Sequence, residues 1–196
     1  MIALTRMSVG FALLATFVPQ GRASAQAPLT LEVRAGVLAP VAGSREGRNR
    51  GGRIGPAGSF GVLFAIERSA TRQFYLGFSQ HRLDCTDDGC GGDGRYIATA
   101  WDLGMRFDLR ALDPVPWLRL GVTIPRVERE RPAPLDAEVS SLGVGVEAGL
   151  GVRFGVGGRL SLSPGVRFGA VDTDLPSGGT LRLRYLAADL GLVVEF

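Results

Sequence analysis

The sequence SLGVGVEAGLGVRF, residues 141–154, is the clearest indication of the fold of this chain. Apolar side chains recur at every second position, beginning with Leu142 and Val144, and the positions between them hold glycine, serine, Glu147 and Arg153. A repeat of two residues is that of a β-strand, because successive side chains of a strand point to opposite faces. The stretch therefore predicts a strand with one apolar face and one face of small and charged residues.

Seven further segments show the same alternation, and they are joined by connections of alternating length. The segments are 29–37, 59–67, 74–81, 97–108, 118–124, 160–169 and 186–196. Long polar connections lie at 40–57, 84–94, 126–138 and 172–180, and the intervening ones are short. One plain end and one elaborated end are typical of membrane barrels. The pattern predicts an all-β fold, an eight-stranded antiparallel up-and-down transmembrane β-barrel, with both chain ends on the side of the short turns.

The non-apolar face of these strands is predicted to line the interior of the barrel, and the apolar face is predicted to point outward. Glycine weakens a strand, so a solvated face would not need the many glycines found here. The interior of an eight-stranded barrel does need them, because it is only just wide enough for side chains to fill. Seven acidic side chains and five arginines share this face and are predicted to point into the lumen: Glu32, Arg34, Glu67, Asp102, Arg106, Asp108, Arg119, Glu147, Arg153, Arg167, Asp189 and Glu195.

The apolar face has a composition that suits lipid. Its aromatic side chains fall into two loose belts, as expected at two membrane interfaces. One belt lies near the short turns (Phe74, Phe107, Phe154 and Phe196) and the other near the long connections (Phe60, Trp101 and Phe168). The alternative is a soluble sandwich in which the same aromatic residues form the core.

Residues 1–25 have the features of a secretory signal peptide. They contain Arg6, an apolar run and the small-residue triplet that ends at Ala25. We expect cleavage there, with cleavage after Ala27 as the other option, so that residues 26–196 form the barrel domain. Removal of this segment lowers the net charge from +3 to +1, which leaves no electrostatic reason to expect a nucleic-acid partner.

The residues 28–196 resemble the small eight-stranded outer-membrane β-barrels of Gram-negative bacteria, the group of the OmpA transmembrane domain and the OmpX-like proteins. The most specific local likeness is the end of the chain, LGLVVEF. The resemblance implies that Phe196 is an assembly signal, read by the barrel-assembly machinery. It also implies a location in the outer membrane with both termini periplasmic. Pro164 departs from the pattern, because it cannot donate a ladder hydrogen bond in mid-strand, and it predicts a bulge or a local break.

The charged lumen has two interpretations. Buried charges are costly unless they are paired, and acidic and basic groups confined in a narrow lumen neutralise one another. We expect a salt-bridge plug that closes the barrel. A narrow or gated path for ions through the same network is the alternative.

Cys85 and Cys90 enclose the sequence TDDG in the second long connection. In an exported protein, two cysteines so close together predict a disulfide. A metal site with the neighbouring aspartates is the alternative, but the spacing does not match the calcium-loop pattern. These aspartates are Asp84, Asp87, Asp88 and Asp93. We expect neither a metal nor a cofactor.

The first long connection carries Arg45, Arg48, Arg50 and Arg53 among glycines. Such clusters are commonly solvated. Beside an outer leaflet, however, these guanidinium groups are placed to bind the phosphates of lipopolysaccharide in bidentate fashion. We therefore expect outer-membrane lipid and lipopolysaccharide as partners of a monomeric barrel.

The single histidine, His81, does not suggest catalysis. Some outer-membrane barrels modify lipid A with a histidine at the lipid-facing surface, but alternation points His81 inward, and Leu83 stands where the H-x-S pattern of the deacylases has serine. The sequence thus predicts a non-enzymatic outer-membrane barrel with a structural or surface-interaction role. A narrow pore is the alternative, and a secreted lipocalin-like binding protein is a further one.

Overall fold

The computed structural model describes residues 28–46, 56–84, 95–130, 138–174 and 180–196. Within these ranges every regular element is a strand, and no helix is long and apolar enough to cross a bilayer. The strands are β1 (Leu29–Glu46), β2 (Ala57–Ser69), β3 (Arg72–Asp84), β4 (Arg95–Asp108), β5 (Val115–Glu130), β6 (Glu138–Val139), β7 (Val144–Gly157), β8 (Leu160–Asp174) and β9 (Thr180–Glu195).

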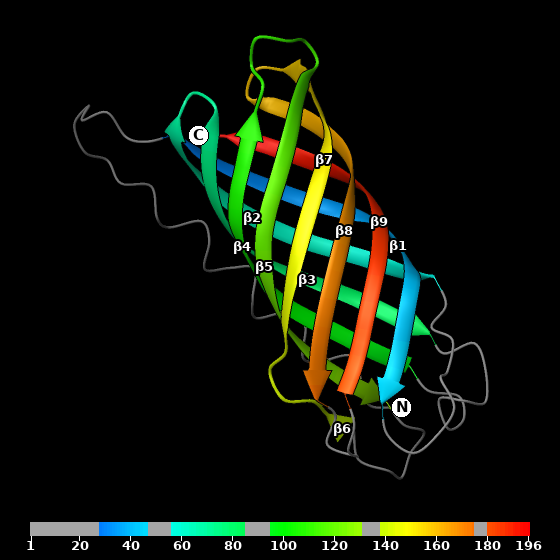
Figure 1. Ribbon diagram of the computed structural model, residues 1–196. Helices are drawn as coiled ribbons and strands as arrows, with labels where there is room; N and C mark the ends of the chain where they lie inside the picture. The colour runs from blue at the N-terminus through cyan, green and yellow to red at the C-terminus, as the bar shows by residue number, and fades with distance from the viewer. Residues whose placement is uncertain (1–27, 47–55, 85–94, 131–137, 175–179) are drawn as a thin grey trace, which may run out of the picture.

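Eight of these strands close into an antiparallel barrel, which confirms the predicted fold class (Figure 1). Each long strand pairs with the long strands before and after it along the chain, and β1 also pairs with β9, so that the first and last strands meet. The short strand β6 pairs with the outer part of β5. Because the sheet closes on itself, its long strands have no free edge to pair with another chain.

The strands are steeply tilted relative to the barrel axis. Paired neighbours followed once around the barrel lead from Leu29 of β1 back to the same strand at Ala39, ten residues further along. In an eight-stranded barrel this stagger corresponds to a tilt of about 40°. The interior of such a barrel is narrow, so inward side chains must pack against one another.

Both ends of the barrel sequence lie at the end with the short turns. The turns between β2 and β3, β4 and β5, and β7 and β8 gather there, together with the C-terminus (Figure 1). The backbone N–H of Phe196 donates a hydrogen bond to the carbonyl of Leu29 (2.8 Å), which joins the last residue to the start of β1. We call this end the short-turn end and the opposite one the long-connection end.

The outward face is apolar over the part of the barrel nearest the short-turn end. Leucine, valine, isoleucine and phenylalanine side chains are exposed on all eight long strands, and Trp101 on β4 is 56% exposed. The residues assigned to the lumen are inward and mostly buried, among them Arg34 and Asp108 at 1% exposure. The two faces are therefore those expected from the alternation.

The strands extend further toward the long-connection end than the sequence indicated. Residues 40–46, 126–130 and 172–174 belong to β1, β5 and β8, and β9 begins at Thr180 rather than at Leu186, so the predicted limits of the long connections were wrong. In the extensions of β5, β8 and β9 the pattern reverses, with Arg126 and Asp172 exposed and Val127 and Val171 buried. The alternation continues, but apolar side chains now point inward and polar ones outward, as in a soluble sheet. Because their outward face is polar, these residues resembled polar loops.

Pro164 breaks the ladder on one side only. The register between β8 and β9 continues through the Pro164–Leu190 pair. Between β7 and β8, the pairs Gly151–Gly165 and Phe154–Leu162 are recorded, but no pair joins the residues between them. The missing N–H of proline thus interrupts the β7–β8 ladder, where we expected a break, and leaves the other neighbour intact.

Candidate functional site

The barrel interior consists of two layers of different chemistry, and it is the candidate site. Inward charged side chains fill the part nearer the short-turn end. Inward apolar side chains fill the part nearer the long-connection end. The first layer was expected from the sequence, and the second was not.

The first ion-pair group is centred on Glu147 of β7. Its carboxylate accepts a hydrogen bond from Arg167 (2.5 Å) and lies 3.2 Å from a guanidinium nitrogen of Arg119 and 3.8 Å from one of Arg34. Arg34 also donates to Asp102 at 3.0 Å, and Arg167 donates to Asp189. Three arginines and three carboxylates are thereby gathered, so the group carries no net formal charge.

The second ion-pair group lies closer to the short-turn end. Arg106 donates to Glu32 (2.8 Å) and to Asp108 (2.9 Å), and Arg153 donates to Asp108 (2.7 Å) and to Glu195 (3.0 Å). All of these side chains are buried except that of Glu195, which is 45% exposed. Asp108 joins the two arginines and therefore has the central position that Glu147 has in the first group.

Aromatic rings occupy the space beside the two groups, and glycines make room for them. The guanidinium carbon of Arg106 lies 4.8 Å from the Trp117 ring centroid, and that of Arg119 lies 5.7 Å from it, distances at which cation–π attraction is effective. A Cβ atom on Gly165 would overlap the Trp117 ring. Part of the glycine content therefore accommodates aromatic rings, and not only arginine and carboxylate groups.

Glu67 belongs to neither group. It is half-buried at the short-turn end, and its carboxylate accepts a hydrogen bond at 2.7 Å from Arg110, in the turn between β4 and β5. The sequence placed Glu67 with the other inward acids because it shares their alternation. Its strand, however, reaches the rim of the barrel at that point.

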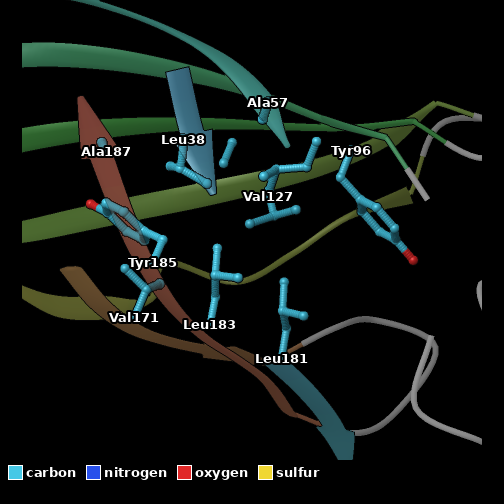
Figure 2. Close-up of a cluster of buried hydrophobic side chains, with 11 residues drawn as sticks. Leu38, Ala57, Tyr96, Val127, Val171, Leu181, Leu183, Tyr185 and Ala187 are labelled. Carbon is cyan, nitrogen blue, oxygen red and sulfur yellow. The ribbon is translucent and has the colours of Figure 1, made fainter. Parts of the chain in front are cut away.

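The apolar layer lies on the long-connection side of the interior. Figure 2 shows side chains from several strands that converge there. They form one cluster: Leu38, Ala57, Leu83, Tyr96, Ala98, Val127, Val171, Leu181, Leu183, Tyr185 and Ala187. The hydroxyl of Tyr185 donates to Glu147 at 3.3 Å, so this tyrosine joins the apolar layer to the first ion-pair group.

Two small spaces adjoin these layers in the described part of the barrel. A cavity of about 20 Å³ lies among the apolar side chains and His81, and one of about 10 Å³ lies between Glu32, Gln73, Arg106 and Arg119. A space of that size holds about one water molecule. His81 is 7% exposed, and its ring centroid lies 5.8 Å from that of Tyr185. It is therefore an interior side chain that points away from the lipid-facing surface.

The other residues singled out from the sequence lie at the rims or outside the described ranges. The backbone of Arg45 is part of β1 and pairs with Leu181. Arg48, Arg50, Arg53, Cys85 and Cys90 lie outside the described residues. Phe196 points outward and is 62% exposed. Among the described residues, no three histidine, cysteine, aspartate or glutamate side chains gather as a metal site.

Sequence reasoning missed Trp117, Leu181, Leu183 and Tyr185. All four point inward, but they lie just beyond the segments that the alternation marked as strands. The signal that reveals the three on β9 is a reversal of the alternation, with alternate apolar residues opposite Arg182 and Arg184 in place of glycine or serine.

Solved outer-membrane proteins share this fold. Neisserial surface protein A superposes with a TM-score of 0.61 at 15% identity, over 86% of this chain and 97% of that one. OprG from Pseudomonas aeruginosa gives 0.58 at 12% identity, over 87% and 96%. A major outer membrane protein from Thermus thermophilus gives 0.50 at 15% identity, over 86% and 99%. No protein-family model and no curated sequence matches the chain.

Proposed function

We propose that this chain is a non-catalytic β-barrel of the bacterial outer membrane with a closed lumen. Its role is structural or lies in contacts made at the cell surface by the long-connection end. The exposed apolar belt supports residence in a membrane, because an aqueous protein rarely exposes so large a continuous apolar surface. The likeness in fold to solved outer-membrane proteins supports the choice of membrane.

The proposal of a closed lumen rests on one observation. The two ion-pair groups and the apolar cluster follow one another along the barrel and fill its interior. An ion crossing the barrel would have to displace paired guanidinium and carboxylate groups and then an apolar layer. Apolar constrictions exclude ions by dewetting. The cavity beside His81 measures about 20 Å³, which is room for about one water molecule rather than for a continuous path.

Single-channel recording in planar bilayers tests the closed lumen. The purified barrel is expected to give no conductance steps, whereas regular steps at a fixed amplitude would support the narrow pore. Refolding is monitored in parallel by heat-modifiable migration in gels. Fractionation of the producing cell tests the location, because recovery in the soluble periplasmic fraction would contradict a membrane protein.

The narrow pore remains the second candidate because the interior has unpaired polar atoms. Buried side-chain atoms without a hydrogen-bond partner among the described residues include Arg106 Nη2, Arg119 Nε, Gln73 Oε1 and Ser79 Oγ. Water molecules bound there would satisfy them, and protons would be conducted only if a file of water also crossed the apolar cluster. Proton flux into vesicles loaded with a pH-sensitive dye distinguishes a water file from a closed interior.

The secreted lipocalin-like alternative is disfavoured by the outward surface. A soluble binding protein would place its apolar side chains inside along the whole barrel. Here they point inside mainly near the long-connection end, and the remaining length exposes them. The proposal of a non-catalytic role rests on the position of the single histidine, which is enclosed in the interior.

The biogenesis of the barrel forms part of the proposal. Residues 1–25 would direct export and be removed, and the C-terminal Phe196 would be presented to the barrel-assembly machinery. Both ends of the barrel would face the periplasm, so that the long connections face outward. N-terminal sequencing of the mature protein tests the cleavage site, and protease treatment of intact cells tests the orientation, because cleavage should occur only within the long connections.

A further inference from the structure

The reversal of the two faces locates one edge of the membrane belt. On β3, β5 and β9, the first charged outward residues beyond the apolar belt toward the long-connection end are Arg82, Arg126 and Arg184. On β8, the corresponding residue is Asp172. On the short-turn side of this level the outward side chains are mostly apolar, and on the other side of it the interior is mostly apolar instead. Arginine therefore predominates at the level where lipid headgroups would begin.

Two of these arginines have no acidic partner among the described residues. The Arg184 guanidinium donates to the Asp172 carboxylate at 2.9 Å. Arg82 and Arg126 are both exposed, and in the described part of the chain neither guanidinium makes an ion pair. Each thus offers a complete set of N–H donors to a ligand from outside the protein.

The register places these two arginines on either side of β4. Arg82 of β3 pairs with Ile97, and Arg126 of β5 pairs with Thr99, two residues away on the same strand. Two strand spacings and a two-residue offset separate their Cα atoms by about 12 Å. Two extended arginine side chains span that distance, so both guanidinium groups reach a single anion above Thr99.

The outward surface on the belt side of the two arginines is aromatic. Phe78 and Trp101 lie on β3 and β4, one alternation step from Gln80 and Thr99, and their rings meet edge to face with centroids 5.8 Å apart. A ligand that binds there meets two cationic groups above an apolar surface. That combination fits an amphiphile with an anionic headgroup, and a bidentate guanidinium suits phosphate in particular.

We propose that Arg82 and Arg126 form a binding site for the phosphate of an outer-leaflet lipid, whose acyl chain lies against Phe78 and Trp101. The inference rests on the proposed function, because it requires the barrel to sit in an outer membrane with its long connections outward. Glu128, two residues beyond Arg126, opposes the phosphate electrostatically and limits its position to the belt side of the two guanidinium groups.

Native mass spectrometry of the detergent-solubilised full chain, titrated with diphosphoryl lipid A, tests the site. We expect a retained lipid whose affinity falls at least tenfold in the Arg82→Ala/Arg126→Ala variant. The matched control is Arg68→Ala/Arg72→Ala, which removes two exposed arginines at the short-turn end and should bind lipid A like the unaltered chain. The Arg82→Lys/Arg126→Lys variant should lie between, because lysine keeps the charge without the bidentate geometry.

Equal lipid retention by the two alanine variants would overturn the proposal. Complete competition by millimolar inorganic phosphate would overturn it as well, because it would indicate a site for free phosphate without an acyl chain. Heat-modifiable migration and flotation with vesicles are measured for every variant. If the unaltered chain fails to float with vesicles, the proposed function fails; if it floats and the arginine variants bind alike, only this site fails.

Discussion

Arg34 of β1 donates a hydrogen bond to Asp102 of β4 at 3.0 Å, across the interior of the barrel. The two residues are far apart in sequence and are not on neighbouring strands, so only closure of the barrel brings them together. Both belong to the ion-pair group around Glu147.

Glu147→Gln should be strongly destabilising. The variant leaves Arg34, Arg119 and Arg167 without the carboxylate that they share. Loss of one partner from a buried ion pair costs about 3–5 kcal/mol. Urea unfolding of the barrel in lipid vesicles, followed by gel migration, measures the loss. Glu195→Gln is the control, because that side chain is 45% exposed and its pair should contribute about 1 kcal/mol or less. Equal losses would contradict the central role of Glu147.

Gly169→Val should be destabilising because the position faces an aromatic ring. A Cβ atom on Gly169 would overlap the ring of Tyr185, which leaves no room for a side chain. Overpacking of this kind costs about 1–3 kcal/mol. Gly58→Val is the control, since nothing lies within 4 Å of its Cβ position. In the Gly169→Val/Tyr185→Ser double variant the losses should fall short of the sum of the two single losses, and strict additivity would argue against contact.

A charge in the middle of the outward belt should be far more costly than a charge beyond its edge. Leu120 and Glu128 lie on the same face of β5, the first inside the belt and the second outside it. Leu120→Arg should lower the free energy of unfolding in vesicles by about 2–4 kcal/mol, and Glu128→Arg by about 1 kcal/mol or less. Similar values at both positions would mean that the belt does not contact lipid.

The two tryptophans should respond differently to brominated lipids. Trp101 is 56% exposed on the outward face, whereas Trp117 is 6% exposed in the interior. Bromine on the acyl chains should quench the fluorescence of the unaltered barrel, and the emission left in Trp101→Phe should be almost insensitive to it. Strong quenching in that variant would place Trp117 against lipid and would contradict the assignment of the faces.

Cys85 and Cys90 are predicted to form a disulfide in the mature protein. Alkylation under non-reducing conditions, followed by mass spectrometry, should find no modified cysteine in the folded chain. Alkylation of both residues before reduction would refute the disulfide. Cys85→Ser/Cys90→Ser should leave the lumen closed in bilayer recordings, because the two ion-pair groups and the apolar cluster are formed by other residues.

The alternation predicted the strands and the inward position of residues such as Glu147 and Asp102 because each strand reports its own two faces. It placed Glu67 among the luminal acids because alternation does not show where a strand reaches the rim. The last strand was predicted to begin at Leu186, whereas β9 begins at Thr180. Leu181 and Leu183 point inward, so this part of the strand has no apolar outward face and resembled a loop.

The alternation of residues is enough to predict a barrel with one apolar and one charged face, because strand periodicity is a local property. The folded barrel is needed to show which charges pair, that Glu147 and Asp108 each join several arginines, and that the two faces exchange their apolar and polar character near Arg82 and Arg126. These relationships depend on the strand register around the closed barrel. One circuit of the barrel shifts that register by ten residues, and the pairing of every neighbouring strand pair contributes to the shift.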